Sequence, residues 1–155
     1  LYTVPVTGGR VRRITPAEGK EGAFSPKGDT IAYTRGPGAW YRKNYRGSSN
    51  DDIWLMSADG TNNRRMTTFN GQDHSPMWAN DTSLFYVSEL FGTANIVRQP
   101  TSGVSKPVQI TSHKDDAVRR ARISKNGEYI VYECGPDLWI TSTREGSSPR
   151  KLAIE

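Results

Sequence analysis

The sequence is poor in the residues that build a large apolar core or a covalent framework. Only 34% of its 155 residues are hydrophobic, the mean hydropathy is −0.69, and Cys134 is its one cysteine. A single cysteine excludes a disulfide network within the chain, and we interpret Cys134 as a small, half-buried apolar residue. No window approaches the ~18 consecutive apolar residues of a membrane helix, so no membrane partner is expected.

Groups that bind metals or activate nucleophiles are equally scarce. The two histidines, His74 and His113, have no second His or Cys at ligand spacing, so no metal or other cofactor is expected. The chain also lacks the Gly-x-Ser-x-Gly elbow of many serine hydrolases. Asp73, His74 and Ser75 are consecutive, but adjacent strand residues point to opposite faces, so we interpret them as a hydrogen-bonded turn. The chain itself is therefore predicted not to be an enzyme.

What the chain does have is a repeated β-hairpin. Residues 23–34, AFSPKGDTIAYT, read as two short strands around a turn made by Pro26 and Gly28. The pattern returns at residues 123–133 with Asn-Gly at the turn, and at residues 78–88 with one residue fewer. Such a recurring hairpin is a structural unit rather than an isolated feature.

Each hairpin is followed by an apolar strand, a glycine turn and a short closing strand. The residues that close the units are Thr15, Thr67, Thr111 and Ala153, which lie 52, 44 and 42 residues apart. Four short strands in a period of about 40–45 residues are typical of a β-propeller blade. We therefore predict an all-β fold, a β-propeller fragment of about three and a half four-stranded antiparallel blades.

The phase of the repeat divides the chain into blades. Residues 1–18 form the outer half of a blade, and residues 19–68, 69–112 and 113–155 form three complete blades. The chain thus begins inside a repeat, and we expect it to be part of a longer protein. An open arc leaves an apolar face bare at each end, where Trp54, Phe85 and Trp139 are expected, so we expect assembly with missing blades or with another copy.

The first blade carries a loop insertion at residues 36–52, longer than the two to five residues of a plain turn. It contributes the candidate binding residues Trp40, Tyr41, Arg42, Lys43, Tyr45 and Arg46. The aromatic residues could fold back and cover the end of their own blade, or the segment could present anchors to a partner. Both interpretations remain open at this point.

A second candidate site follows from the alignment of the hairpins. Since the first strand of each blade lines the central channel of a propeller, the equivalent residues Glu21, Ser75 and Arg120 are expected near that channel. With Arg119 and Arg122, the last blade would give the channel a positive patch that attracts peptide carboxylates. A lyase or peptidase of another family would instead use Arg119, Arg120 and His74.

The net charge of +5 and the isoelectric point near 9.5 raise the question of nucleic acid. However, the basic residues are scattered, and several recur on the closing strand, where charge discourages edge-to-edge pairing. No nucleic-acid partner is expected.

The repeat, with SPKG, IAY and then DIW and SADGT, resembles TolB-like propellers. More specifically, AWYRKNYRGSSNDDIW is similar to a segment of the tricorn protease family, and LFYVSELFGTANIV, QITSHKDDAVRRARIS and EYIVYECGPDLWI follow in that family's order. The resemblance implies the latter half of a six-bladed N-terminal propeller in a large serine peptidase. It also implies that the propellers form passages for peptides and that the catalytic residues lie in other domains.

The leading hypothesis is therefore a non-catalytic module of a tricorn-like serine peptidase, which guides peptides or supports assembly. Its expected partners are peptides or other domains of that peptidase, and its expected compartment is the cytoplasm. The alternative is a TolB-like periplasmic protein-interaction propeller with no link to a peptidase.

Overall fold

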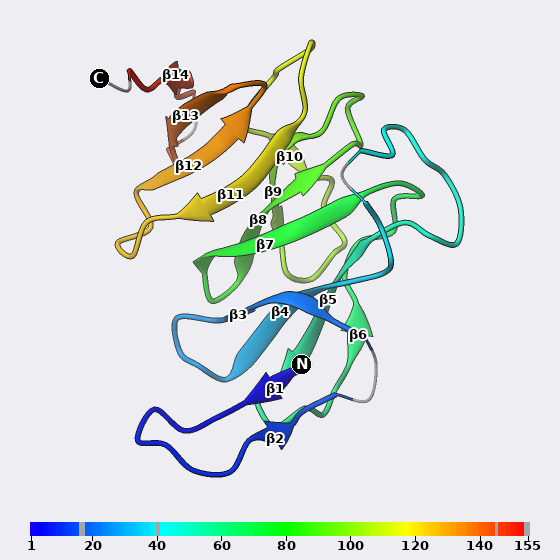
Figure 1. Cartoon of the computed structure of the whole chain (residues 1–155), viewed down its shortest axis with the longest axis vertical. Coiled ribbons are helices and arrows are strands. Elements are labelled where there is room, and N and C mark those ends of the chain that lie inside the picture. The colour runs from blue at the N-terminus through cyan, green and yellow to red at the C-terminus, as the bar shows by residue number, and fades with distance from the viewer. Residues whose placement is uncertain (16–17, 40, 145, 154–155) are drawn as a thin grey trace.

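The computed structural model describes residues 1–15, 18–39, 41–144 and 146–153. The described chain consists of short antiparallel strands, which form four sheets that follow one another in chain order, from bottom to top in Figure 1. Within these residues, no helix is long and apolar enough to cross a membrane.

The strands alternate with turns that the sequence marks with glycine and proline. Their bounds are β1 (Tyr2–Thr3), β2 (Arg12–Arg13), β3 (Lys20–Phe24), β4 (Thr30–Arg35), β5 (Asp52–Ser57), β6 (Arg64–Arg65), β7 (Asp73–Asn80), β8 (Ser83–Ser88), β9 (Asn95–Pro100), β10 (Val108–Gln109), β11 (Val118–Ile123), β12 (Tyr129–Cys134), β13 (Asp137–Ser142) and β14 (Arg150–Lys151).

Three of the sheets have four strands in simple sequential order, β3 to β6, β7 to β10 and β11 to β14, and β1 pairs with β2 in a fourth. Sequential four-stranded antiparallel sheets are the blades of a propeller, so the predicted fold is confirmed. The closing strands are shorter than predicted, with two residues each. The insertion predicted at 36–52 is a loop that ends one residue earlier, because Asp52 already pairs with Arg35 in the β4–β5 ladder.

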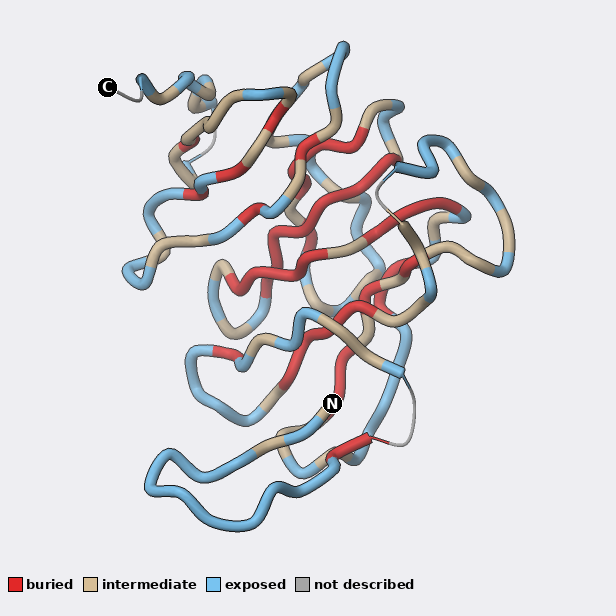
Figure 2. The backbone as a smooth tube through the Cα atoms, in the orientation of Figure 1, coloured by how far each residue is buried: buried red, intermediate tan, exposed pale blue. Residues whose placement is uncertain are grey.

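The apolar core lies between successive blades, where Figure 2 shows the buried residues as a band through the middle of the chain. Phe85 packs between the second and third complete blades, and Trp139 packs against the same cluster. Trp54 packs on the cluster that joins the first complete blade to β1 and β2. The expectation that these three side chains lie on bare end faces is therefore wrong, because each points toward a neighbouring sheet.

A different set of residues lies on the outward face of the last blade. Tyr129 and Val131 alternate with the buried Ile130 and Tyr132 along β12, and they are 47% and 37% exposed. Across the ladder, Val131 pairs with Ile140 of β13. This outward face of the last blade is therefore partly apolar.

Candidate functional site

The first strand of each complete blade has a β-bulge at the same position. In the ladders to the second strands, two residues oppose one between Lys20 and Ala23, between His74 and Met77, and between Arg119 and Arg122. The single opposing residues are Tyr33, Tyr86 and Tyr132, all of them buried. A bulge bends its strand and changes the direction in which the extra residue points.

The residues at the bulges are Glu21, Ser75 and Arg120, with φ angles of 55°, 56° and 49°. This left-handed conformation is uncommon for residues other than glycine, asparagine and aspartate. Its recurrence at one position in three blades confirms that the three residues are equivalent, as the hairpin alignment predicted.

The three bulges open into one pocket of about 570 Å³, which is lined by side chains from β3, β7 and β11. Glu21, Ser75 and Arg120 all line this channel pocket, and so do Arg119 and Arg122. The three arginines thus lie on the same pocket as the bulge residues of the other two blades.

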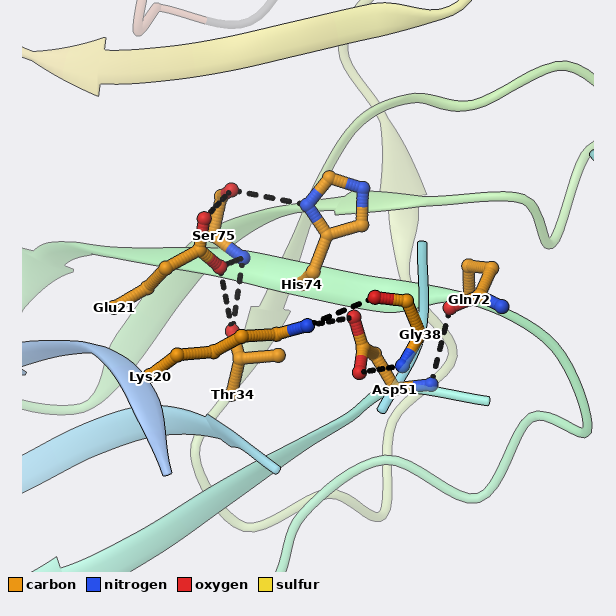
Figure 3. A network of polar contacts seen from close by, with 8 residues as sticks. All are labelled: Lys20, Glu21, Thr34, Gly38, Asp51, Gln72, His74 and Ser75. Atoms are coloured by element: carbon orange, nitrogen blue, oxygen red, sulfur yellow. Dashed lines mark hydrogen bonds and ion pairs between the residues drawn. The ribbon is translucent and has the colours of Figure 1, made fainter. Parts of the chain in front are cut away.

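Glu21 links the first strands of two successive blades, as Figure 3 shows. Its Oε2 accepts hydrogen bonds from the backbone N–H of Ser75 and from the hydroxyl of Thr34, both at 2.8 Å. Its Oε1 accepts one from the hydroxyl of Ser75 at 2.9 Å. Burial alone would raise the pKa of Glu21, but these bonds and the neighbouring His74 together lower it below its usual value.

The side chains of His74 and Ser75 lie together, with Nδ1 and Oγ 3.0 Å apart. The expectation that they point to opposite faces was wrong, because the bulge at Ser75 breaks the alternation of the strand. The pair lies in strand β7 rather than in a turn. Since Ser75 donates its proton to Glu21, the histidine Nδ1–H is the donor to Oγ. This arrangement stabilises the bulge. It does not place an unprotonated imidazole nitrogen where it could accept the proton of the serine hydroxyl.

Burial lowers the pKa of His74, although Glu21 and Asp51 act in the opposite direction. The ring is therefore neutral at pH 7 and adds no positive charge to the channel pocket.

Three arginines gather on the third complete blade. Arg120 pairs with Glu133 at 2.8 Å and Arg119 approaches the same carboxylate at 3.8 Å. Arg122 donates to the backbone carbonyl of Ala121. Two guanidinium groups thus share one carboxylate, and the side chain of Arg120 is 79% exposed. Among the side chains of the three arginines and Glu133, which all line the channel pocket, three are basic and one is acidic.

The opposite wall contains an ion pair between a half-exposed lysine and a buried aspartate, which fixes the start of the insertion. Lys20 Nζ lies 2.9 Å from Asp51 Oδ2 and donates to the carbonyl oxygen of Gly38 at 3.0 Å. Asp51 Oδ1 in turn accepts the N–H of Gly38 at 2.9 Å. A side chain on Gly38 would collide with Asp51 and Gln72, so glycine is required for this close approach.

Two residues in the second half of the insertion contact the next blade. Glu89, after β8, accepts the N–H of Asn44 at 3.1 Å and pairs with Arg46 at 3.5 Å. Arg46 also stacks on the ring of Phe69, 4.6 Å from its centroid. Asn44 and Arg46 of the loop thus contact the second blade, whereas Gly38 contacts Lys20 and Asp51 of its own blade.

The structure does not bring the two predicted groups of binding residues together. Gly38 and Ala39 line the channel pocket, but none of residues 41–46 does. Tyr41 is 68% exposed, Arg42 and Lys43 are also exposed, and Arg42 stacks on Tyr45 at 4.0 Å. Trp40 lies outside the described residues. Among the described residues there is also no group of three or more His, Cys, Asp or Glu side chains that could hold a metal ion.

Comparison with known proteins agrees with this architecture. Residues 1–147 match the model of the tricorn protease N-terminal beta propeller domain. A curated relative from Streptomyces coelicolor, "Putative tricorn protease homolog 2", is 29% identical over 120 residues, which are 76% of this chain and 9% of that protein. The chain thus spans about a tenth of the length of this relative.

Solved structures show the same fold at lower identity. The crystal structure of the tricorn protease superposes with a TM-score of 0.71 at 19% identity, over 86% of this chain and 12% of that one. TolB from Acinetobacter baumannii superposes with a TM-score of 0.73 at 18% identity, over 98% of this chain and 37% of that one. The family match, the bulged four-stranded blades and their order lead to one conclusion: the chain belongs to the family of tricorn protease N-terminal β-propeller domains.

Proposed function

We propose that this chain is a non-catalytic propeller module of a tricorn-like serine peptidase, and that its channel pocket guides peptides by binding their carboxylates. The observation that carries the proposal is that Arg119, Arg120 and Arg122 all line the channel pocket, where Arg119 and Arg120 share the single carboxylate of Glu133. A guanidinium group binds a carboxylate through two parallel N–H bonds, and the exposed Arg120 is positioned to offer this geometry.

The opposite wall favours an extended peptide over a compact anion. The carboxylate of Glu21 already accepts hydrogen bonds, and the carboxylate of Asp51 pairs with Lys20. Their negative charges keep this side of the pocket from having a net positive charge. The positive charge is therefore confined to one wall. A peptide terminus would be held by the arginines while the remaining residues lie along the pocket.

Fluorescence anisotropy with a labelled hexapeptide that has a free carboxylate tests the proposal. Replacing Arg119, Arg120 and Arg122 together with glutamine should weaken binding about tenfold or more, since hydrogen bonds to charged groups contribute roughly 1.5–3 kcal/mol each. Arg150→Gln, an exposed arginine of the closing strand β14, is the matched control and should leave binding unchanged. Equal affinity of the triple variant and the wild type would refute the proposal, and hydrolysis of casein by the purified chain would refute its non-catalytic part.

A second candidate function is protein–protein interaction of the TolB-like kind, independent of a peptidase. The favouring observation is the exposed Tyr41–Arg42–Lys43 segment, which lies on a loop that Glu89 fixes to the next blade. Aromatic and basic residues on a rigid support make good contact anchors. Loss of partner capture in a Tyr41→Ala/Arg42→Ala variant with unchanged peptide affinity would favour this function over the first.

A further inference from the structure

A second pocket lies at the junction of the first and second complete blades, on the side of the outer strands. Its volume is about 510 Å³, and we call it the Asp73 pocket after the acid among its lining residues. Its walls include the aromatic rings of Phe69, Tyr86 and Phe91 and the exposed side chain of Val104. It shares no lining residue with the channel pocket.

The carboxylate of Asp73 is the unusual feature of this pocket. Asp73 is 1% exposed, and only the hydroxyls of Ser88 and Thr67 approach its carboxylate, without a well-formed hydrogen bond to either oxygen within the described part of the chain. An unpaired buried carboxylate is costly, because burial disfavours the charged form. The propeller repeat does not require an acid here, since the equivalent residue of the next blade is Val118, which packs in the core.

Two polar side chains that line the pocket beside Asp73, those of Tyr86 and Gln99, have already used protons in hydrogen bonds to other groups. The Tyr86 hydroxyl donates to Gln99 Oε1 at 2.7 Å, and the Gln99 amide donates to the carbonyl oxygen of Ser105 at 2.6 Å. A ligand that pairs with the oxygens of Tyr86 and Gln99 must therefore bring its own N–H donors.

The charged neighbours do not neutralise Asp73. Arg65 of β6 is engaged by Asp52 of β5 at 2.7 Å, and Asp52 is itself a second negative group nearby. Lys106 lies at the mouth of the pocket and is exposed, and no ion pair joins it to Asp73 within the described residues. The pocket thus combines a buried negative charge with aromatic walls.

We propose that the Asp73 pocket binds a small organic cation, an aliphatic ammonium or guanidinium group such as a lysine or arginine side chain carries. The cation's N–H groups donate to the carboxylate and to the free lone pairs of Tyr86, and its alkyl part packs on Phe91 and Val104. Aromatic rings beside a desolvated cation add a favourable cation–π contribution. This inference does not depend on peptide binding in the channel pocket.

Calorimetric titration of the 155-residue chain with n-butylamine and with n-butylguanidinium tests the proposal. Both cations should bind in a saturable manner, and neutral n-butanol should not. Asp73→Asn should weaken cation binding about tenfold or more, whereas Asp115→Asn, a matched exposed acid on a loop, should leave it unchanged. Lys106→Ala should keep or strengthen binding, since it removes a competing cation.

The pH dependence provides an independent readout. Burial raises the pKa of Asp73 to about 7, against the opposing effect of the Ser88 and Thr67 hydroxyls. Cation affinity should therefore rise about tenfold from pH ~6 to pH ~8, as the carboxylate ionises. If Asp73→Asn fails to fold, Phe91→Ala alters only the exposed wall and should still weaken binding severalfold.

The source of the cation can be distinguished with acetyl-Gly-Lys-Gly-amide. Tighter binding of this peptide than of n-butylamine identifies a protein side chain as the ligand, and weaker binding identifies a free amine. Absence of saturable binding, equal affinity in Asp73→Asn, or equally tight binding of n-butanol would overturn the proposal.

Discussion

The carboxylate of Glu21 accepts hydrogen bonds from both the backbone N–H and the hydroxyl of Ser75, the residue at the same place in the next blade. The contact joins two positions that are 54 residues apart, and each of them has a left-handed backbone. One bulge thus holds the next one in place, and the shape of the channel pocket depends on this pair.

Glu21→Ala should lower the free energy of unfolding by about 1–2 kcal/mol at pH 7, because it removes three hydrogen bonds to a partly solvated carboxylate. Urea unfolding followed by tryptophan fluorescence measures the change. Glu18→Ala, an exposed acid just before β3, is the matched control and should change stability little. Equal stability of the two variants would show that the Glu21–Ser75 contact does not stabilise the fold.

The same contact predicts a pH dependence. Since the pKa of Glu21 is lower in the folded chain than its ordinary value of 4.5, its contribution is fully present above that value. The contribution should be lost as the pH falls through the lowered folded pKa. The stability difference between wild type and Glu21→Ala should therefore shrink in acid, and a difference that grows below pH ~4.5 would contradict the assignment.

Glu89→Gln should release the insertion from the second blade. The substitution removes the charge that pairs with Arg46 and weakens the bond from the Asn44 N–H. Hydrogen exchange of residues 41–47 should become severalfold faster while exchange in β7 and β8 stays slow. Glu128→Gln, on the hairpin turn of the last blade, is the control and should leave loop exchange unchanged. Unchanged exchange in Glu89→Gln would mean that other contacts hold the loop.

Val131→Lys should prevent association through the outward face of the last blade. We propose that this face, with Tyr129 and Val131 exposed, is covered by further blades or by a second copy of the chain. Sedimentation equilibrium at micromolar concentration should show self-association of the wild type and a monomer for Val131→Lys. Val6→Lys, at a fully exposed position near the opposite end, should associate like the wild type. A monomeric wild type would argue against assembly through this face.

The repeat of the hairpins predicted the sheets, their order and the equivalence of Glu21, Ser75 and Arg120. These features follow from turn chemistry and strand alternation, which are local and therefore visible in one sequence. The approach of Arg119, Arg120 and Arg122 to the channel pocket followed from the same alignment.

What the sequence did not predict depends on contacts across blade junctions. The bulge that puts His74 and Ser75 side by side arises only when β7 pairs with β8 and packs beside Glu21. Likewise, Asp73 read as part of a polar turn, since nothing local shows that the neighbouring blade buries it. One signal of this burial was available in the sequence. Asp73 is an acid at a position where the third complete blade has Val118.

The central claim is that the arginine wall of the channel pocket recognises a carboxylate, and one comparison tests it most directly. The dissociation constants of two peptides, identical except for a free or an amidated C-terminus, should be measured against the wild type and against the variant with glutamine at positions 119, 120 and 122. For the wild type, the free carboxylate should bind about tenfold more tightly than the amide, and in the variant the ratio should fall to about one. Equal affinities of the two peptides for the wild type would contradict the claim.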